Sequence, residues 1–232
     1  LLREVISHAV EKLTAAGIEN PKVDVELLVG HVLGMSRGEV QTAVISETEI
    51  SDEKLAELNS GFGRRFEREP LQHITGIAYF RQLELHVGPG VFIPRPETES
   101  VVQLAIDALR ASGLPEPIAV DLGTGSGAIA LAMHTEVQNA KVFAVEKSPE
   151  AFAYTVKNFA KYPGAELQLG DLADCFNALN GSVSVVVSNP PYIPAAAIPR
   201  DVEVHLYDPD LALYGGDDGM DVIHLVSATA KR

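Results

Sequence analysis

The sequence contains almost no cysteine. Cys175 is the only one among 232 residues, so the chain cannot form an internal disulfide. No group of histidines and cysteines has the spacing of a zinc site, and we expect no bound metal. A lone cysteine is typical of a structural thiol in a reducing compartment. We therefore expect a cytoplasmic protein.

Long hydrophobic runs are also absent. None approaches the ~20 apolar residues that a membrane-spanning helix needs. Charged residues such as Arg3, Glu4 and Lys12 interrupt the opening segment, which therefore does not resemble a secretory signal peptide. Hydrophobic residues make up 46% of the chain, enough for one large or two smaller globular domains. We expect no association with a membrane.

Basic residues are scarce. The 18 lysines and arginines stand against 32 aspartates and glutamates, and the net charge is −14. Such a charge repels polyanions. The one basic cluster, Arg64, Arg65 and Arg68, is interleaved with Glu67 and Glu69, a pattern typical of a solvated helix face. Direct binding of nucleic acid is therefore not expected.

Residues 1–75 have the apolar spacing of helices. Asn20 is placed to cap a helix whose first residue is Pro21, and Gly34 is placed to end it. Ser51 is placed to cap a later helix. We predict a small helical bundle. It contains no catalytic constellation, so its function is either the recognition of a partner or purely structural.

Residues 76–95 are predicted to form a linking hairpin. Strand-like residues from Ile77 to Val87 are followed by the turn residues of positions 88–90. Arg95 then lies between two prolines, which impose an extended and stiff segment before a helix begins near Pro96. A stiff segment that aims an arginine favours a functional role for Arg95, although an ordinary helix start would look similar, and the context does not specify the role.

From Ile118 onward, strands and helices alternate. Apolar runs at residues 118–122, 141–146, 166–169 and 183–187 predict four strands with helices between them. Continuous apolar strands separated by helices are typical of a parallel sheet covered on both faces. The predicted fold class is therefore α/β.

Polar residues and glycines collect at the carboxyl ends of these strands, where ligands bind in such sheets. They are Asp121, Gly123 to Gly127, Glu146, Asp171 with Leu172, and Asn189. The glycines allow a ligand to approach the backbone, and we expect their N–H groups to favour an anionic group. Glu146 is placed to accept hydrogen bonds from both hydroxyls of a ribose, and Asp171-Leu172 is placed to border a base.

The stretch from Ser188 to Tyr192 directly follows the last predicted strand. Pro190 and Pro191 lack an N–H and have a fixed φ, so they end the strand and stiffen the loop. Asn189 offers a side-chain carbonyl, and Tyr192 offers a flat ring with a polar tip. The loop therefore fits a planar NH2 group, either an amide or an exocyclic base amine, although Asn-Pro-Pro is also a common turn signal.

Two classes of cofactor fit the glycine turn. Gly123, Gly125 and Ala128, with an acidic residue further on, satisfy the dinucleotide fingerprint of an NAD-dependent oxidoreductase. That alternative does not explain the loop from Asn189 to Tyr192. S-adenosylmethionine does, because its methionine carboxylate would occupy the turn, its adenosine would reach Glu146, and its methyl group would point at the loop.

Five motifs together resemble a known family. Asp121-Leu-Gly-Thr-Gly-Ser-Gly127 is similar to the cofactor motif of class I S-adenosylmethionine methyltransferases, and Asn189-Pro-Pro-Tyr192 to the substrate motif of those that methylate an amide or base nitrogen. Three stretches narrow the resemblance to the peptide chain release factor N5-glutamine methyltransferases, over essentially the whole chain: Phe92-Ile-Pro-Arg-Pro-Glu-Thr-Glu99, Tyr207-Asp-Pro-Asp-Leu-Ala-Leu213 and Gly215-Gly-Asp-Asp-Gly-Met-Asp221.

The resemblance implies a helical substrate-recognition domain over residues 1–75 and a Rossmann-like class I methyltransferase domain over residues 96–232. It also implies transfer of a methyl group from S-adenosylmethionine to a glutamine in the Gly-Gly-Gln loop of a release factor, which leaves S-adenosylhomocysteine. The expected cofactor residues are Asp121, Gly123, Thr124, Gly125, Ser126, Gly127, Glu146, Asp171, Leu172 and Asn189. The expected substrate residues are Phe92, Asn189, Pro190, Pro191 and Tyr192.

Two of these positions depart from the family pattern. Glu146 stands where aspartate is usual, which should preserve ribose binding. Leu172 stands where an aromatic residue can occur, which should loosen the packing of the adenine.

The expected mechanism rests on two acceptors. An amide nitrogen is a poor nucleophile because its lone pair is delocalised into the carbonyl. If Asn189 Oδ1 and the Pro190 carbonyl each accept one amide N–H, the lone pair can develop toward the methyl group as the nitrogen loses planarity. Asn189 and Pro190 are therefore the candidate catalytic residues, and no strong general base is required.

Other functions stay open. A glutamine of a ribosomal protein is one alternative substrate, and the adenine amine of DNA is another, although the acidity of the chain counts against DNA. A non-catalytic cofactor-binding module is a third alternative, because the family has seven strands and only four precede a helix that begins at Asp221. We expect the C-terminal strands to be absent from this chain and the edge of strand 183–187 to be open to association.

Overall fold

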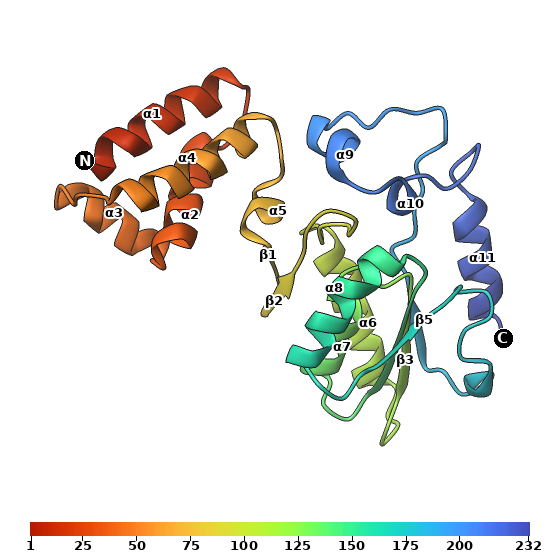
Figure 1. Ribbon diagram of the computed structural model, residues 1–232. Coiled ribbons are helices and arrows are strands. Elements are labelled where there is room, and N and C mark those ends of the chain that lie inside the picture. Colours follow the sequence, from red (N-terminus) through yellow and green to blue (C-terminus); the bar gives the residue numbers. More distant parts are fainter. The chain divides into compact units, whose positions relative to one another are not determined.

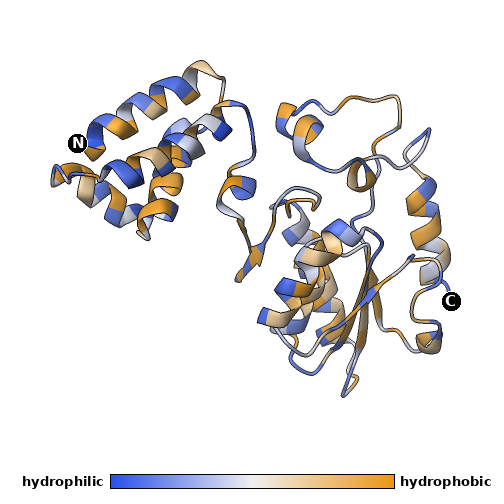
Figure 2. Cartoon of the chain, in the orientation of Figure 1, coloured by the Kyte–Doolittle hydropathy of each residue, from blue (hydrophilic) through white to orange (hydrophobic).

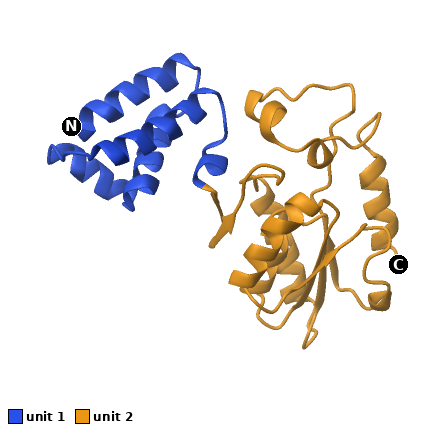
Figure 3. Ribbon diagram, in the orientation of Figure 1, with its two compact units in different colours: residues 1–75 blue, residues 76–232 orange.

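The computed structural model describes all 232 residues, and the chain forms two compact units (Figure 3). The first spans Leu1–Thr75 and the second spans Gly76–Arg232. Each unit has its own buried hydrophobic cluster.

The first unit is a bundle of five helices, as the apolar spacing predicted in outline. Helix α2 packs against α1, α3 and α4. Leu2, Leu13, Val25, Leu28 and Leu58 are almost fully buried at the centre of the bundle. The helices are α1 (Leu2–Ala15), α2 (Pro21–Leu33), α3 (Arg37–Ile45), α4 (Asp52–Phe66) and α5 (Leu71–Thr75).

The helix caps agree only partly with the sequence prediction. The Ser51 hydroxyl accepts the Lys54 N–H at 3.3 Å, so the cap of α4 is confirmed. The prediction for Asn20 is wrong, because the residue stands at the N-cap of α2 but its side chain makes no capping bond. Helix α3 was not predicted, although Ser36 and Glu39 form a capping box before it.

The second unit is built on a four-stranded parallel sheet in the order β5-β4-β3-β6, which confirms the α/β fold class. The predicted hairpin is also present, as the antiparallel pair of β1 and β2. The strands are β1 (Ile77–Phe80), β2 (Leu83–His86), β3 (Ile118–Leu122), β4 (Lys141–Glu146), β5 (Glu166–Leu169) and β6 (Val185–Val187).

Strand β6 is shorter than predicted. The apolar run predicted a strand over residues 183–187, but the ladder with β3 begins at Val185. Ser184 lies at the start of this pairing, where its N–H donates to Ile118 O and its hydroxyl accepts the Ile118 N–H. Among the strands of this chain, β6 pairs with β3 alone and forms one edge of the sheet.

Helices cover the sheet on both faces (Figure 1). Helices α6, α7 and α8 lie on one face, and α11 lies on the other, where it is mostly hydrophobic (Figure 2). The short helices α9 and α10 connect β6 to α11. The helical elements are α6 (Thr98–Ala111), α7 (Ala128–Glu136), α8 (Pro149–Lys161), the 3-10 helix η1 (Asn177–Leu179), α9 (Val202–Tyr207), α10 (Asp210–Leu213) and α11 (Asp221–Ala230).

Alternation along β3 divides the core of the second unit. Ala119 packs with α6, α7 and the β1–β2 hairpin in one cluster. Val120 and Leu122 pack on the opposite face with Cys175 and Phe176. Because side chains alternate along a strand, Asp121 points to the helix-covered face and is fully buried there.

Candidate functional site

A cavity of about 570 Å³ opens at the carboxyl ends of the parallel strands. It brings together most residues that the sequence predicted for a site, and adds walls from residues 90–101 and 204–225. The predicted site residues that line it are Phe92, Gly123, Thr124, Gly125, Ser126, Glu146, Asp171, Leu172, Asn189, Pro190, Pro191 and Tyr192. Asp121 and Gly127 lie behind its wall.

The glycine turn joins β3 to α7. Gly123, Gly125 and Gly127 all have positive φ, between 59° and 88°, which favours glycine. A Cβ atom at Gly123 or Gly125 would meet nothing within 4 Å, so these glycines face open space. A Cβ atom at Gly127 would lie 2.9 Å from Phe159, so Gly127 is required for packing.

The turn's N–H groups are mostly engaged within the protein, so only part of the expected N–H cradle is open to an anion. Gly123 and Thr124 donate to Val145 O, Gly127 donates to Thr124 O, and Gly125 donates to Glu146 Oε2. The Ser126 N–H is the one backbone N–H of the turn without a protein acceptor. The sequence could not show this, because three of these four bonds go to acceptors on β4.

Asp121 supports the turn from below. Its Oδ2 accepts the Thr124 hydroxyl at 2.6 Å and the Ala130 N–H at 3.1 Å. Its Oδ1 is buried and has no partner. Burial raises the pKa of Asp121 to about 7, the charge of Glu146 adds to the rise, and the two hydrogen bonds oppose it.

Two further carboxylates border the cavity. Glu146 ends β4, and its two oxygens accept the N–H groups of Gly125 and Ser148 at 2.8 and 2.7 Å. Asp171 follows β5 and pairs with Lys147 at 2.9 Å. The pKa of Asp171 is lowered by the backbone N–H of Ala173 and by Lys147. Both carboxylates retain lone pairs for donors that enter the cavity.

The loop after β6 presents two unused acceptors. The Ser188 hydroxyl donates to Leu122 O at 2.6 Å and so fixes the start of the loop to the end of β3. The Asn189 side chain is exposed and has no hydrogen bond to the protein, and no protein donor reaches the Pro190 carbonyl. Tyr192 is 65% exposed. The loop therefore offers carbonyl oxygens and a ring to a ligand.

The backbone of this loop rests on a second glycine turn. The Gly215 N–H donates to Ile193 O, and the Ile193 N–H donates to Leu213 O, both at 2.9 Å. A Cβ atom at Gly219 would lie 2.2 Å from Tyr192 O, and one at Gly215 would lie 2.6 Å from Pro191 O. Only glycine allows this approach.

Sequence reasoning missed two buried polar residues on α8. The Thr155 hydroxyl donates to Gly125 O at 2.6 Å. The Asn158 side chain donates to Ser126 O and His86 O and accepts the His86 N–H. Both side chains are fully buried. A signal was present, because polar residues at this i, i+3 spacing fall on the face of α8 that carries Ala151 and Phe159.

Arg95 makes contacts that its sequence context did not indicate. Its guanidinium group lies 4.8 Å from the centroid of the Phe92 ring, and its Nη2 donates to Asp208 Oδ2. Burial raises the pKa of Asp208 to about 6, while Arg95 opposes the rise and Asp201 adds to it. Arg95 and Phe92 both line the cavity.

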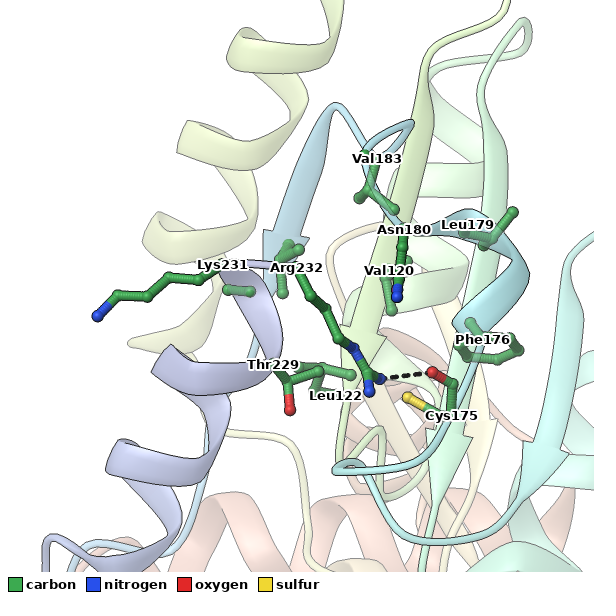
Figure 4. Close-up of a pocket in the computed structure, with 13 residues that line it drawn as sticks. Val120, Leu122, Cys175, Phe176, Leu179, Asn180, Val183, Thr229, Lys231 and Arg232 are labelled. Carbon is green, nitrogen blue, oxygen red and sulfur yellow. Dashed lines mark hydrogen bonds between the residues drawn. The ribbon is translucent and has the colours of Figure 1, made fainter.

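A second cavity of about 230 Å³ lies beside the end of α11 (Figure 4). Its lining is mainly apolar, from Val120, Leu122 and Phe176, and the Arg232 guanidinium bonds to Cys175 O at 2.6 Å. Burial raises the pKa of the Cys175 thiol, which keeps it protonated. No predicted site residue lines this cavity.

No group of three or more histidine, cysteine or acidic side chains is arranged to hold a metal ion. No helix combines the length and the apolar character that crossing a bilayer requires.

Two family models match the chain. The PrmC N-terminal domain matches residues 4–76, and the methyltransferase small domain matches residues 82–206. The second match covers more than half of the chain and includes the glycine turn, Glu146 and the loop from Asn189 to Tyr192.

Curated relatives extend over the whole chain. It is 47% identical over 233 residues to the release factor glutamine methyltransferase of Streptomyces coelicolor, a match that spans all of this chain and 80% of that protein. It is 35% identical over 236 residues to the 4-amino-L-phenylalanine/4-methylamino-L-phenylalanine methyltransferase of Streptomyces pristinaespiralis, which spans all of this chain and 78% of that protein.

The fold is also found in a solved structure. The catalytic domain of hMettl16, in complex with the MAT2A 3′UTR hairpin 6, matches with a TM-score of 0.50 over 78% of this chain and 63% of that one. The sequence identity is 12%, so the likeness concerns the fold alone.

Proposed function

The chain belongs to the family of release factor glutamine methyltransferases, and on this premise we propose that it transfers a methyl group from S-adenosylmethionine to the side-chain amide nitrogen of a glutamine in a peptide chain release factor. The observation that carries the proposal is the pair of unused acceptors, Asn189 Oδ1 and the Pro190 carbonyl, on a loop that borders the same cavity as the glycine turn and Glu146. A reaction on release factors also assigns the protein to the cytoplasm.

The residues of the cavity fit the proposed cofactor. The Ser126 N–H, which has no protein acceptor, suits the methionine carboxylate. Asp121 lies behind the cavity wall and acts on the cofactor through the turn, which it holds at Thr124 and Ala130. Glu146 keeps lone pairs for the ribose hydroxyls, and Leu172 offers an apolar wall for the adenine. When bound, S-adenosylmethionine supplies an electrophilic methyl group and leaves as S-adenosylhomocysteine.

The chain's own residues act on the glutamine amide. Asn189 Oδ1 and the Pro190 carbonyl each accept one N–H, which favours a pyramidal nitrogen whose lone pair is available. Pro191 fixes the backbone between them and Tyr192, while Tyr192 and Phe92 enclose the amide plane. The nitrogen forms a bond to the methyl carbon and releases one proton to solvent, so no protein base is needed. The placement of the amide nitrogen opposite the methyl carbon supplies most of the rate enhancement.

A second candidate substrate is a small aromatic amine. The relative from Streptomyces pristinaespiralis is named for methylation of 4-amino-L-phenylalanine, and two carbonyl acceptors fit any planar NH2 group. The higher identity to the release factor enzyme favours the protein substrate. DNA is disfavoured, because the net charge of −14 repels a polyanion.

We also assign the first unit, residues 1–75, to recognition of the protein substrate. The support is that the unit has its own core and matches the N-terminal domain model of the family. A chain lacking these residues should bind the cofactor normally in calorimetry but lose methylation of the release factor. Weakened cofactor binding in that chain would contradict the assignment.

The test compares three acceptors with labelled S-adenosylmethionine: a release factor, 4-amino-L-phenylalanine and DNA. Label on one release-factor glutamine, found by peptide mass spectrometry, is the expected result. Label found only on one of the other acceptors would overturn the proposal that a release factor is the substrate. Asn189→Ala should lower methyl transfer by about 100-fold or more while cofactor binding in calorimetry survives.

Asn180→Ala is the matched control for this variant. Asn180 is also an exposed asparagine of the second unit, but it lines the other cavity. The Asn180→Ala variant should transfer methyl groups at the rate of the wild type. If Asn189→Ala loses cofactor binding together with activity, Asn189 belongs to the cofactor site or to folding.

A further inference from the structure

Arg95 lies in a segment whose backbone is fixed from both sides. Pro94 and Pro96 hold φ near −65° on either side of it, and the preceding Val91 and Ile93 are buried. The side chain therefore leaves an anchored stretch of chain and borders the cavity. An arginine held in this way can fix the groups that it contacts.

Arg95 contacts two parts of the cavity wall. Its guanidinium group stacks on Phe92, three residues before it, with 4.8 Å to the ring centroid. Its Nη2 donates to Asp208, which is 113 residues later in the chain. The ion pair therefore joins the segment that carries Phe92 to the segment that carries α9 and α10.

Asp208 is the joint between these two short helices. It is the residue after α9, where its N–H donates to Val204 O, and Pro209 after it is the N-cap residue of α10. The Asp208 side chain is only 1% exposed, against 34% for Arg95, and its Oδ1 has no partner. A buried carboxylate needs a partner charge. The position of Asp208, and with it the junction between α9 and α10, therefore depends on Arg95.

The segment around Asp208 forms one wall of the cavity. Val204, Pro209, Leu211 and Leu213 all line it. No hydrogen bond or ion pair joins Arg95 or Asp208 to the glycine turn or to Glu146. The pair is therefore placed to shape the substrate side of the cavity and not its cofactor side.

We propose that Arg95 and Asp208 are positioning residues whose ion pair holds the segment of α9 and α10 against Phe92, so that the glutamine of the protein substrate is held opposite Asn189. The inference rests on the proposed function. Neither residue touches the reacting atoms, and both act through the wall that they join.

The test separates positioning from stability. Arg95→Met leaves Asp208 buried without its partner, so both the melting temperature and kcat/KM for the release factor should fall, kcat/KM by about 100-fold. The double variant Arg95→Met with Asp208→Asn has no unpaired buried charge. Its melting temperature should recover while its kcat/KM stays low, because the two segments are still not joined.

Cofactor affinity and a remote ion pair are the controls. Calorimetry should give S-adenosylmethionine affinities within about twofold of the wild type for all variants, since the cofactor side is independent. Arg81→Met breaks the pair of Arg81 with Glu136, whose side chains are 16% and 21% exposed and line neither of the two cavities described above. It should lower the melting temperature and leave kcat/KM unchanged.

Three results would overturn the inference. Recovery of kcat/KM in the double variant would make the pair merely structural, and a cofactor affinity that falls with kcat/KM would assign the pair to the cofactor site. A wild-type chain that labels no release factor would overturn the proposed function itself. Wild-type activity is therefore measured first, which distinguishes the two failures.

Discussion

Asp121 should make the stability of the second unit depend on pH, and Asp121→Asn should remove that dependence. The carboxyl group is 0% exposed. It has two donors, Thr124 and Ala130, on one oxygen and none on the other. Burial therefore outweighs the hydrogen bonds and raises its pKa from 3.8 to about 7.

The sign and size follow from this pKa. Between pH 3.8 and about 7 the folded chain keeps the Asp121 proton that the unfolded chain has lost, so the free energy of unfolding falls as the pH rises. At about 1.4 kcal/mol for each pH unit, the loss across this interval is about 4 kcal/mol. Asparagine does not titrate. The free energy of unfolding of Asp121→Asn, minus that of the wild type, should therefore rise by about 4 kcal/mol between about pH 4 and about pH 8.

The assay is urea unfolding followed by circular dichroism at a series of pH values. Other titrating groups, Asp208 among them, are common to both proteins and cancel in the difference. Asp174→Asn is the matched control, because Asp174 is an exposed aspartate of the same unit. The difference between its free energy of unfolding and that of the wild type should not change with pH.

A flat difference for Asp121→Asn would refute the reasoning. If the two unfolding free energies stay parallel within about 1 kcal/mol across the range, burial does not hold the carboxyl group against ionisation. The unpartnered oxygen would then have to be hydrated or bound by a donor in the protein.

Three further variants test the two glycine turns. Gly127→Ala should lower the free energy of unfolding by about 1–3 kcal/mol in urea, because φ is +88° and the Cβ atom meets Phe159; a melting curve like that of the wild type would contradict this. Gly219→Ala should lower kcat by about 100-fold with normal cofactor affinity, since its Cβ atom must displace the Tyr192 carbonyl; unchanged kcat would show that the loop can shift. Glu146→Gln should weaken cofactor binding in calorimetry by about tenfold, because an amide NH2 cannot accept the second of two N–H groups; unaltered affinity would exclude this role.

The sequence was informative where the fold depends on local patterns. Buried parallel strands are apolar throughout, so β3, β4 and β5 were found within a residue of their ends. The helix α3 was missed because Gly38 lies in its first turn, and its capping box was the only strong signal. The prediction that Asn20 caps α2 failed because a favourable residue type at the N-cap does not ensure that its side chain makes the capping hydrogen bond.

The sequence predicted which residues gather at the site but not which hydrogen bonds and ion pairs they make. Strand ends of a parallel sheet meet at one edge, which is why Glu146, Asp171 and Asn189 share a cavity. The partners of the turn's N–H groups and of Asp208 come from residues 21 and 113 positions away. Such pairings depend on tertiary packing, which no local pattern encodes.

Asn158 has a consequence for the dynamics of the molecule. Its one side chain accepts the His86 N–H and donates to the carbonyls of His86 and Ser126, so the hairpin and the glycine turn share a single buried amide. Neither segment can open without leaving that amide unsatisfied. In hydrogen–deuterium exchange the His86 amide should therefore open together with α8, as part of one cooperative unit. The turn that meets the ligand would then be as slow to open as the core helix behind it.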